Sequence, residues 1–164
     1  MGCVLVTRYP ISNAEEQQQQ QQQQQPVQPV VLARGYSREL PGNTHAEANA
    51  LTKARNLSPE QLSELFPFST SAVRGSTITI DDVLKYTDVY TTLEPCSVRT
   101  SGLAPCADAL VASKVLRCFI GVGEPNDFVQ CEGAQKLKAA GCQVIWVKGL
   151  EEECLAAARR GRQE

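Results

Sequence analysis

The stretch DVYTTLEPCSVRTSGLAPCADALVASKVLRCFIGVG, residues 88–123, decides the fold. It opens with a β-branched-rich run, Asp88–Leu93, and closes with a second apolar run, Leu116–Gly123, and both runs are typical of buried strands. A helix is expected to begin between them, near Pro105. Because strands that alternate with helices are joined by parallel crossovers, the stretch predicts a unit of parallel sheet.

The alternation continues toward the C-terminus. GAQKLKAAG, residues 133–141, predicts a helix, and Cys142–Val147 predicts the next strand. Residues 151–160 predict a last helix that begins with acids and ends with arginines, an order that the helix dipole favours.

Toward the N-terminus, two short apolar runs, Gly2–Thr7 and Val30–Gly35, predict strands that pair as an antiparallel hairpin. Residues 45–56 carry alanines at four-residue steps and predict a helix capped by Thr44, and SPEQLSELF from Ser58 predicts a second capped helix. Residues 71–82 are too ambiguous to assign. The expected fold class is α/β: a three-layer α/β/α sandwich around a mixed five-stranded sheet whose first hairpin is antiparallel.

Residues 9–29 separate the two strands of that hairpin and contain nine consecutive glutamines, Gln17–Gln25. Such a tract cannot bury enough apolar surface to offset the entropy lost on ordering, so it is expected to be a disordered insertion.

A chain of 164 residues is long enough for one buried core and short for two, so residues 1–164 are expected to form a single domain.

The composition of the chain argues against some kinds of binding partner and cellular setting. The net charge of -2, with charges of both signs mixed along the chain, gives no basic footprint for nucleic acid, and the RRGR cluster at Arg159–Arg162 is expected to be a solvated end. No apolar run reaches the roughly 20 residues of a membrane span. Seven cysteines, an odd number, and no secretory signal favour a reducing, cytoplasmic setting.

Three residues at the ends of predicted strands and helices have side chains that can bind a metal ion. Cys96 follows a predicted strand, and Cys106 lies in the first turn of a predicted helix, where the dipole favours a thiolate. His45, the only histidine, begins another helix. Two thiolates and one imidazole are three of the four ligands of tetrahedral zinc, and a site that leaves the fourth position to water is typical of catalytic zinc.

Glu47 distinguishes a catalytic zinc site from a structural one. A carboxylate two residues after a zinc-binding histidine can act as a proton shuttle without binding the metal, and a structural site has no use for it. His-Ala-Glu followed by two Pro-Cys pairs matches the zinc-deaminase signature H-x-E…P-C-x-x-C. Nine residues separate Cys96 from Cys106 here, where the signature has two.

Three longer segments carry a family resemblance: GYSRELPGNTHAEANAL from Gly35, YTTLEPCSVRTSGLAPCADAL from Tyr90, and IGVGEPNDFVQCEGAQKLKAAGCQVIWV from Ile120. They resemble the pyrimidine deaminases of riboflavin biosynthesis, within the cytidine deaminase-like superfamily, and the stand-alone fungal form more than the bacterial deaminase-reductase fusion. The resemblance implies zinc-dependent hydrolytic deamination of 2,5-diamino-6-ribitylamino-4(3H)-pyrimidinone 5'-phosphate. It also implies a homodimer, with His45, Cys96 and Cys106 as zinc ligands and Glu47 as the proton shuttle.

The same resemblance indicates contacts with the phosphorylated pyrimidine substrate. Glu124 and Asn126, in the EPN segment, are candidates for the pyrimidine, with a plain proline turn as the alternative. Arg99 and Arg38 are candidates for the phosphate, because the guanidinium fork suits phosphate, with solvated surface charge as the alternative. Glu94 is a candidate for supporting the zinc ligands or for a salt bridge. The helix that relatives carry before the first strand is expected to be absent.

Two other functions stay open at this point. The chain can be a deaminase of another base, a cytosine, deoxycytidylate or tRNA adenosine, although the tRNA reading calls for a basic surface. It can also be a non-catalytic, zinc-stabilised binding module that uses the glutamine tract for interaction. The presence of Glu47 favours catalysis over that module.

Overall fold

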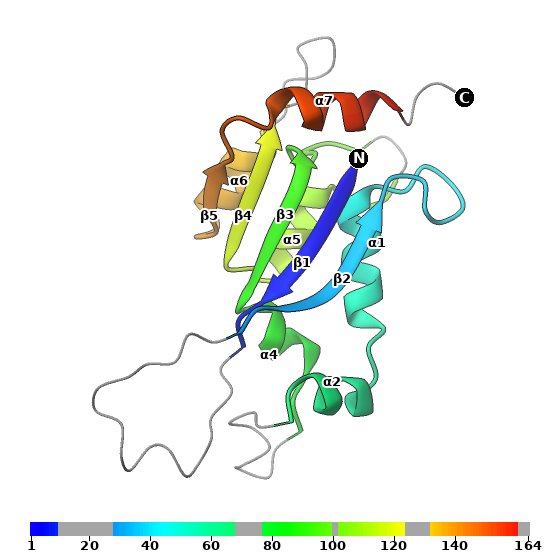
Figure 1. The fold of residues 1–164 in the computed structure, drawn as a ribbon, viewed down its shortest axis with the longest axis vertical. Coiled ribbons are helices and arrows are strands. Elements are labelled where there is room, and N and C mark those ends of the chain that lie inside the picture. The colour runs from blue at the N-terminus through cyan, green and yellow to red at the C-terminus, as the bar shows by residue number, and fades with distance from the viewer. Residues whose placement is uncertain (10–27, 68–76, 100–101, 124–131, 161–164) are drawn as a thin grey trace.

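A computed structural model describes residues 1–9, 28–67, 77–99, 102–123 and 132–160. The described chain forms a five-stranded sheet in the order β2-β1-β3-β4-β5 with helices packed against it (Figure 1). Its elements are β1 (Gly2–Thr7), β2 (Val30–Tyr36), α1 (Ala46–Arg55), α2 (Pro59–Leu65), α4 (Ile80–Leu84), β3 (Thr87–Leu93), α5 (Cys106–Ala112), β4 (Arg117–Val122), α6 (Gly133–Ala139), β5 (Gln143–Trp146) and α7 (Glu151–Arg160).

The sheet is mixed. β1 pairs antiparallel with β2 on one side and with β3 on the other, while β3, β4 and β5 run parallel. The predicted antiparallel first hairpin and the parallel second half are therefore both confirmed. Because β3 and β4 run parallel, their carboxyl ends lie at one edge of the sheet, the edge at which α/β proteins hold ligands.

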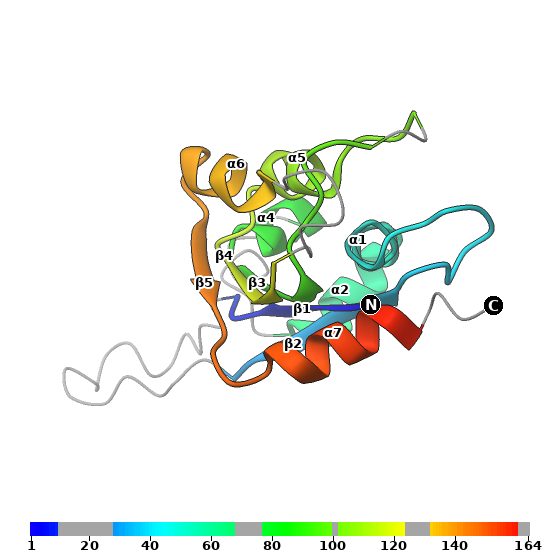
Figure 2. The same ribbon diagram turned by 90° about the horizontal axis from the view of Figure 1, so that it is seen from above.

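Helices lie on both faces of the sheet. Figure 2 shows α1, α5 and α6 on one face, and α7 is the one helix of the described residues on the other, so it is what the described chain contributes to the third layer of the predicted sandwich. Beside α7 that face holds an open groove of about 830 Å³ lined almost wholly by apolar atoms, with the rings of Tyr90 and Phe119 stacked 4.5 Å apart. No described helix is long and apolar enough to cross a membrane.

The core lies between the sheet and the helices on the α1 face, and α2 and α4 also contribute buried residues to it. The middle strands contribute Leu5, Val89 and Ile120, all with no exposed surface, because alternate residues of a strand face the same side. α1 packs closely on β2 because Gly35 has no side chain: a Cβ there would lie 2.3 Å from the Ala46 carbonyl oxygen. This close approach brings the first turn of α1 close to β2, and Figure 2 shows α1 lying over that edge of the sheet.

Three expectations need correction or fall outside the described chain. Helix α4 begins in the stretch that the sequence left unassigned and ends two residues beyond it, and the Thr79 hydroxyl accepts a hydrogen bond from the Asp82 amide. Thr44 does not cap α1, because His45 occupies the N-cap position. The Thr44 hydroxyl instead donates to the Leu40 carbonyl and accepts from the side-chain amide nitrogen of Asn49. Most of the predicted insertion, residues 10–27, lies outside the described residues.

Candidate metal centre and active site

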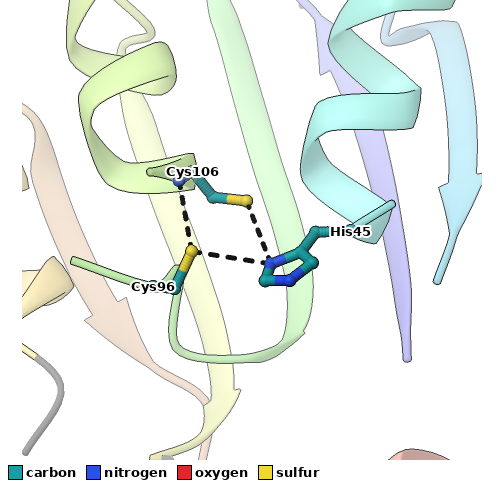
Figure 3. A group of neighbouring side chains, drawn as sticks. All are labelled: His45, Cys96 and Cys106. Carbon is teal, nitrogen blue, oxygen red and sulfur yellow. Dashed lines mark hydrogen bonds between the residues drawn. The ribbon is translucent and has the colours of Figure 1, made fainter. Parts of the chain in front are cut away.

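His45 stands at the N-cap of α1 in an extended backbone conformation. Its ring makes no capping hydrogen bond with the helix, so the imidazole is free to point away from α1. Figure 3 shows the ring turned toward the two cysteines, with Nδ1 facing both sulfur atoms. His45 therefore occupies the cap position without capping the helix, and its side chain is directed at the two cysteines.

The two cysteines reach the same point from different elements. Cys96 lies in the loop that follows β3, and Cys106 is the first residue of α5, after the N-cap Pro105. The Cys106 amide donates to the Cys96 sulfur at 3.3 Å, and the Ala107 amide donates to the Cys96 carbonyl at 3.1 Å. Although nine residues separate the cysteines, the loop between them is thus closed by the first turn of α5.

The separations of the three ligand atoms fit tetrahedral zinc. His45 Nδ1 lies 3.5 Å from the sulfur of Cys96 and 3.5 Å from that of Cys106. Zn–S bonds of about 2.3 Å and Zn–N bonds of about 2.0–2.1 Å at the tetrahedral angle place the nitrogen and each sulfur about 3.6 Å apart. All three ligand atoms lie within 4.8 Å of one another, so they surround one point at which a metal ion can bind.

Protonation of the three groups is interdependent. The hydrogen bond from the Cys106 thiol, with those from His45 and the Cys106 amide, lowers the pKa of Cys96 to about 4. The pKa of Cys106 is raised because its proton is shared with Cys96 and because the thiol is buried. Hydrogen bonding to Cys96 raises the pKa of His45. The hydrogen bonds directed at Cys96 favour its thiolate, the form in which a cysteine binds a metal ion.

Glu47 lies beside this cluster and is only 7% exposed. Burial raises the pKa of its carboxyl group, and the hydrogen bond from Thr91 opposes that shift. Thr91 Oγ1 donates to Glu47 Oε1 at 2.7 Å. The charge of Glu47 acts on His45 and Cys106, but its carboxylate is not among the three ligand atoms that meet. A buried carboxylate next to a metal cluster can hold and transfer a proton.

Thr91 is the residue of this site that sequence reasoning missed. It lies in β3 with its side chain on the helix-covered face, where it meets the first turn of α1. Burial alternates along the strand and places Thr91, but not Thr92, on the same face as Val89 and Leu93. The sequence offers only the two-residue period of a strand, which does not say which of the two faces the helices cover.

Of the proposed substrate contacts, the structure brings Arg99 to the cluster. Its Nη2 donates to the Asn43 carbonyl at 2.7 Å, two residues before His45, and its Nε is buried without a hydrogen-bond partner in the described chain. Its charge acts on both His45 and Cys106. Arg38 lies exposed in the turn after β2, with a left-handed φ of 62°. Glu124 and Asn126 lie outside the described residues.

Glu94 makes no salt bridge among the described residues. Instead its Oε1 accepts a hydrogen bond of 2.8 Å from the Ala134 amide at the start of α6. The side chain therefore joins the end of β3, two residues before Cys96, to a helix on the far side of the loop. Of the two readings of Glu94, support of the metal loop is the one that agrees with this contact.

The carboxyl edge of this sheet, with two sulfurs, one imidazole nitrogen and a buried carboxylate, defines an α/β protein built around a zinc site. Residues 1–122 match the family described as the cytidine and deoxycytidylate deaminase zinc-binding region. The match covers more than half of the 164 residues, and the chain belongs to this zinc-binding family.

Known relatives are consistent with that assignment. The chain is 37% identical over 131 residues to the diaminohydroxyphosphoribosylamino-pyrimidine deaminase of Schizosaccharomyces pombe, covering 80% of this chain and 27% of that protein. It thus spans about a quarter of the length of this curated relative. The Aspergillus oryzae Rib2 deaminase at pH 4.6 aligns with a TM-score of 0.62 at 29% identity, over 99% of this chain and 80% of that one. The same deaminase in complex with DARIPP aligns with a TM-score of 0.59 at 26% identity, over 99% and 81%.

Proposed function

We propose that this protein is a zinc-dependent hydrolase that removes a ring amino group, as ammonia, from 2,5-diamino-6-ribitylamino-4(3H)-pyrimidinone 5'-phosphate in riboflavin biosynthesis. The buried carboxylate of Glu47 beside a complete ligand set carries the proposal, because a purely structural zinc site needs ligands only. The choice of substrate is supported by the name of the fungal relative and by the Rib2 deaminase that was solved with DARIPP.

In this proposal His45 Nδ1 and the sulfurs of Cys96 and Cys106 hold the zinc ion. Bound zinc supplies a Lewis acid that makes water acidic enough to react as a nucleophile near neutral pH. The first turn of α5 supports the ligands, since the Cys106 amide points at the Cys96 sulfur and favours its thiolate form. Arg99 adds positive charge beside the cluster.

Glu47 moves the protons of the reaction. It accepts a proton from the attacking water and gives it to the ring nitrogen. It then accepts the second proton, from the hydroxyl now bonded to the ring carbon, and gives it to the departing amino group, so that a carbonyl oxygen replaces the amino group and ammonia leaves. A carboxyl group with a raised pKa suits this exchange, because a weaker acid holds the proton more firmly between its acceptance and its return. Thr91 holds one oxygen of the carboxylate in a fixed orientation.

The proposed substrate contacts differ in the structural observations that support them. Arg99 is the favoured partner for the phosphate, because its Nε is buried and unpaired in the described chain beside the metal cluster. Arg38 is a second candidate, although it lies exposed in the turn that precedes His45. Glu124 and Asn126 are proposed to contact the pyrimidine. We further propose that the protein acts as a homodimer in the cytoplasm; the six cysteines in the described chain are all free, which agrees with a reducing compartment.

The test is an assay of ammonia release from the zinc-loaded chain with the ribitylamino-pyrimidine phosphate, cytidine and deoxycytidylate as separate substrates. Turnover of the first alone is expected. Glu47→Gln should lower kcat by roughly 10²- to 10⁴-fold with zinc content unchanged, because it removes the proton carrier but no ligand. Glu64→Gln, on the exposed face of α2, is the control and should retain full activity.

Other results would favour the other functions. Preferential turnover of deoxycytidylate would assign the chain to a different pyrimidine. One zinc per chain without turnover of any substrate would support the non-catalytic module.

A further inference from the structure

Helix α6 contacts the loop that carries Cys96 through its first backbone amides. We define this Cys96 loop as residues 94–97. The Ala134 amide donates to Glu94 Oε1 at 2.8 Å, and the Glu132 amide donates to Ser97 Oγ at 3.1 Å. One side chain before Cys96 and one after it are thus bonded to the same helix start. Helix amides that have no partner within the helix are satisfied by the loop.

The backbones of α6 and the loop also touch. A Cβ at Gly133 would lie 1.7 Å from the Pro95 carbonyl oxygen, so only glycine permits this approach. The residue next to Cys96 is therefore in direct contact with the helix that donates the hydrogen bonds. Neither contact involves α1, which carries Glu47 and begins directly after His45.

Lys136 completes the attachment from further along α6. Its Nζ donates to the Ser97 carbonyl at 3.1 Å and to Asp108 of α5 at 3.0 Å. Asp108 lies two residues after Cys106. The helix therefore holds the loop that bears the first cysteine and the helix that bears the second in one arrangement.

We propose that Glu94 and Ser97 are positioning residues for zinc: through α6 they hold the Cys96 sulfur at the distance from His45 and Cys106 that the ion requires. The inference rests on the zinc ligands of the proposed function. A thiolate whose loop is anchored on both sides loses little entropy when it binds the ion, and an unanchored loop would have to be ordered by binding. Zinc affinity should therefore depend on contacts that never reach the metal.

The test measures zinc affinity by competition with a chromophoric chelator, using the full chain freed of metal. Ser97→Ala and Glu94→Ala are each expected to weaken zinc binding roughly tenfold or more, as loss of outer support does at other metal sites. Glu94→Gln keeps an oxygen that can accept from the Ala134 amide and should bind zinc as the wild-type chain does. In the cobalt-loaded proteins, the sulfur-to-metal absorption bands should shift or weaken in the two alanine variants alone.

Thr79→Ala is the matched control, because it removes a side-chain hydrogen bond to a helix amide at α4, in an element that carries no ligand. It is expected to lower the melting temperature and leave zinc affinity unchanged. Wild-type affinity and cobalt spectra in both Ser97→Ala and Glu94→Ala would overturn the inference, as would equal loss in Glu94→Gln and Glu94→Ala. Failure of the proposed function is a separate result, since a chain inactive on every pyrimidine still reports its zinc affinity.

Discussion

Thr91 and Glu47 form their hydrogen bond across 44 positions of sequence, in the interior of the protein. The hydroxyl of Thr91 also lies 3.0 Å from the Leu93 carbonyl, so its position is fixed within β3. A carboxylate that must accept and return protons needs a constant orientation toward its partners, and this threonine supplies one. At the scale of single residues, the site therefore depends on a side chain that neither binds metal nor titrates.

Thr91→Val tests this role, since valine keeps the shape of the side chain and removes the donor. We expect kcat to fall roughly ten- to hundredfold, which corresponds to a lost hydrogen bond to a charged group of about 1.5–3 kcal/mol. Bound zinc should not change. Thr92→Val is the control, because Thr92 faces the other side of the sheet and bonds to Gly2. An unchanged kcat in Thr91→Val would show that Glu47 needs no such support.

How far the site could be predicted from sequence differs among these residues. His45, Cys96 and Cys106 were predictable because their chemistry is uncommon and each stands beside a proline or a helix start. Thr91 was not predictable. Only one of two adjacent threonines reaches the site, and which one depends on which face of the strand packs against the helices. Glu94 and Ser97 act through contacts with α6, and such contacts depend on packing between distant segments.

At the scale of elements, the position of α1 depends on the absence of a side chain at Gly35 in β2. Backbone atoms of Ala46 and Ala50 lie so near that a methyl group at residue 35 would overlap them. His45 precedes the first residue of this helix and Glu47 lies in its first turn, so a displaced α1 would move both residues away from the cysteines. The packing of one strand against one helix thus sets the geometry of half the site.

Gly35→Ala should lower the free energy of unfolding by about 3 kcal/mol, the upper end of what overpacking usually costs, and should weaken zinc binding as well. Thermal unfolding and chelator competition measure the two effects. Gly2→Ala in β1 is the control, since a methyl group at residue 2 would have no atom within 4 Å and both properties should hold. If Gly35→Ala left zinc affinity at the wild-type value, α1 would be positioned by other contacts.

Most elements were predictable to within a residue or two, because strands with continuous apolar runs and helices with alanine steps leave strong patterns. α4 was the exception. Its five residues, Ile80–Leu84, follow an alternation of threonine and isoleucine that is also typical of a strand. The burial of Val83 and Leu84 in the core and the Thr79 cap select the helix, and the first of these depends on the whole fold.

At the scale of the whole molecule, the zinc site joins three separate parts of the chain. His45 comes from the helix after the first hairpin, Cys96 from the loop after β3, and Cys106 from α5. An ion that binds all three links elements that lie far apart in the sequence. Because the unfolded chain has no such arrangement, metal binding adds directly to stability.

We therefore expect free zinc at a hundredfold excess over its dissociation constant to stabilise the protein by about 2.7 kcal/mol relative to the metal-free chain. Thermal or chemical unfolding with and without a chelator measures the difference. His45→Ala should remove most of this dependence on zinc, whereas Cys142→Ala, which changes a cysteine outside the cluster, should keep it. Equal stability with and without zinc would contradict a site that forms only on folding.

The antiparallel pairing of β1 with β3 has a consequence for how this protein tolerates changes in chain length. Thr7 pairs with Val30 and with Thr87, the first residue of β3, whereas Cys96 follows the other end of that strand. Seven residues of strand, about 23 Å, therefore separate the connection after β1 from the zinc cluster. Expansion or contraction of a glutamine repeat in that connection is expected to be close to neutral for catalysis during evolution. The same position is where an affinity tag or a fluorescent reporter can be inserted with the metal centre left intact.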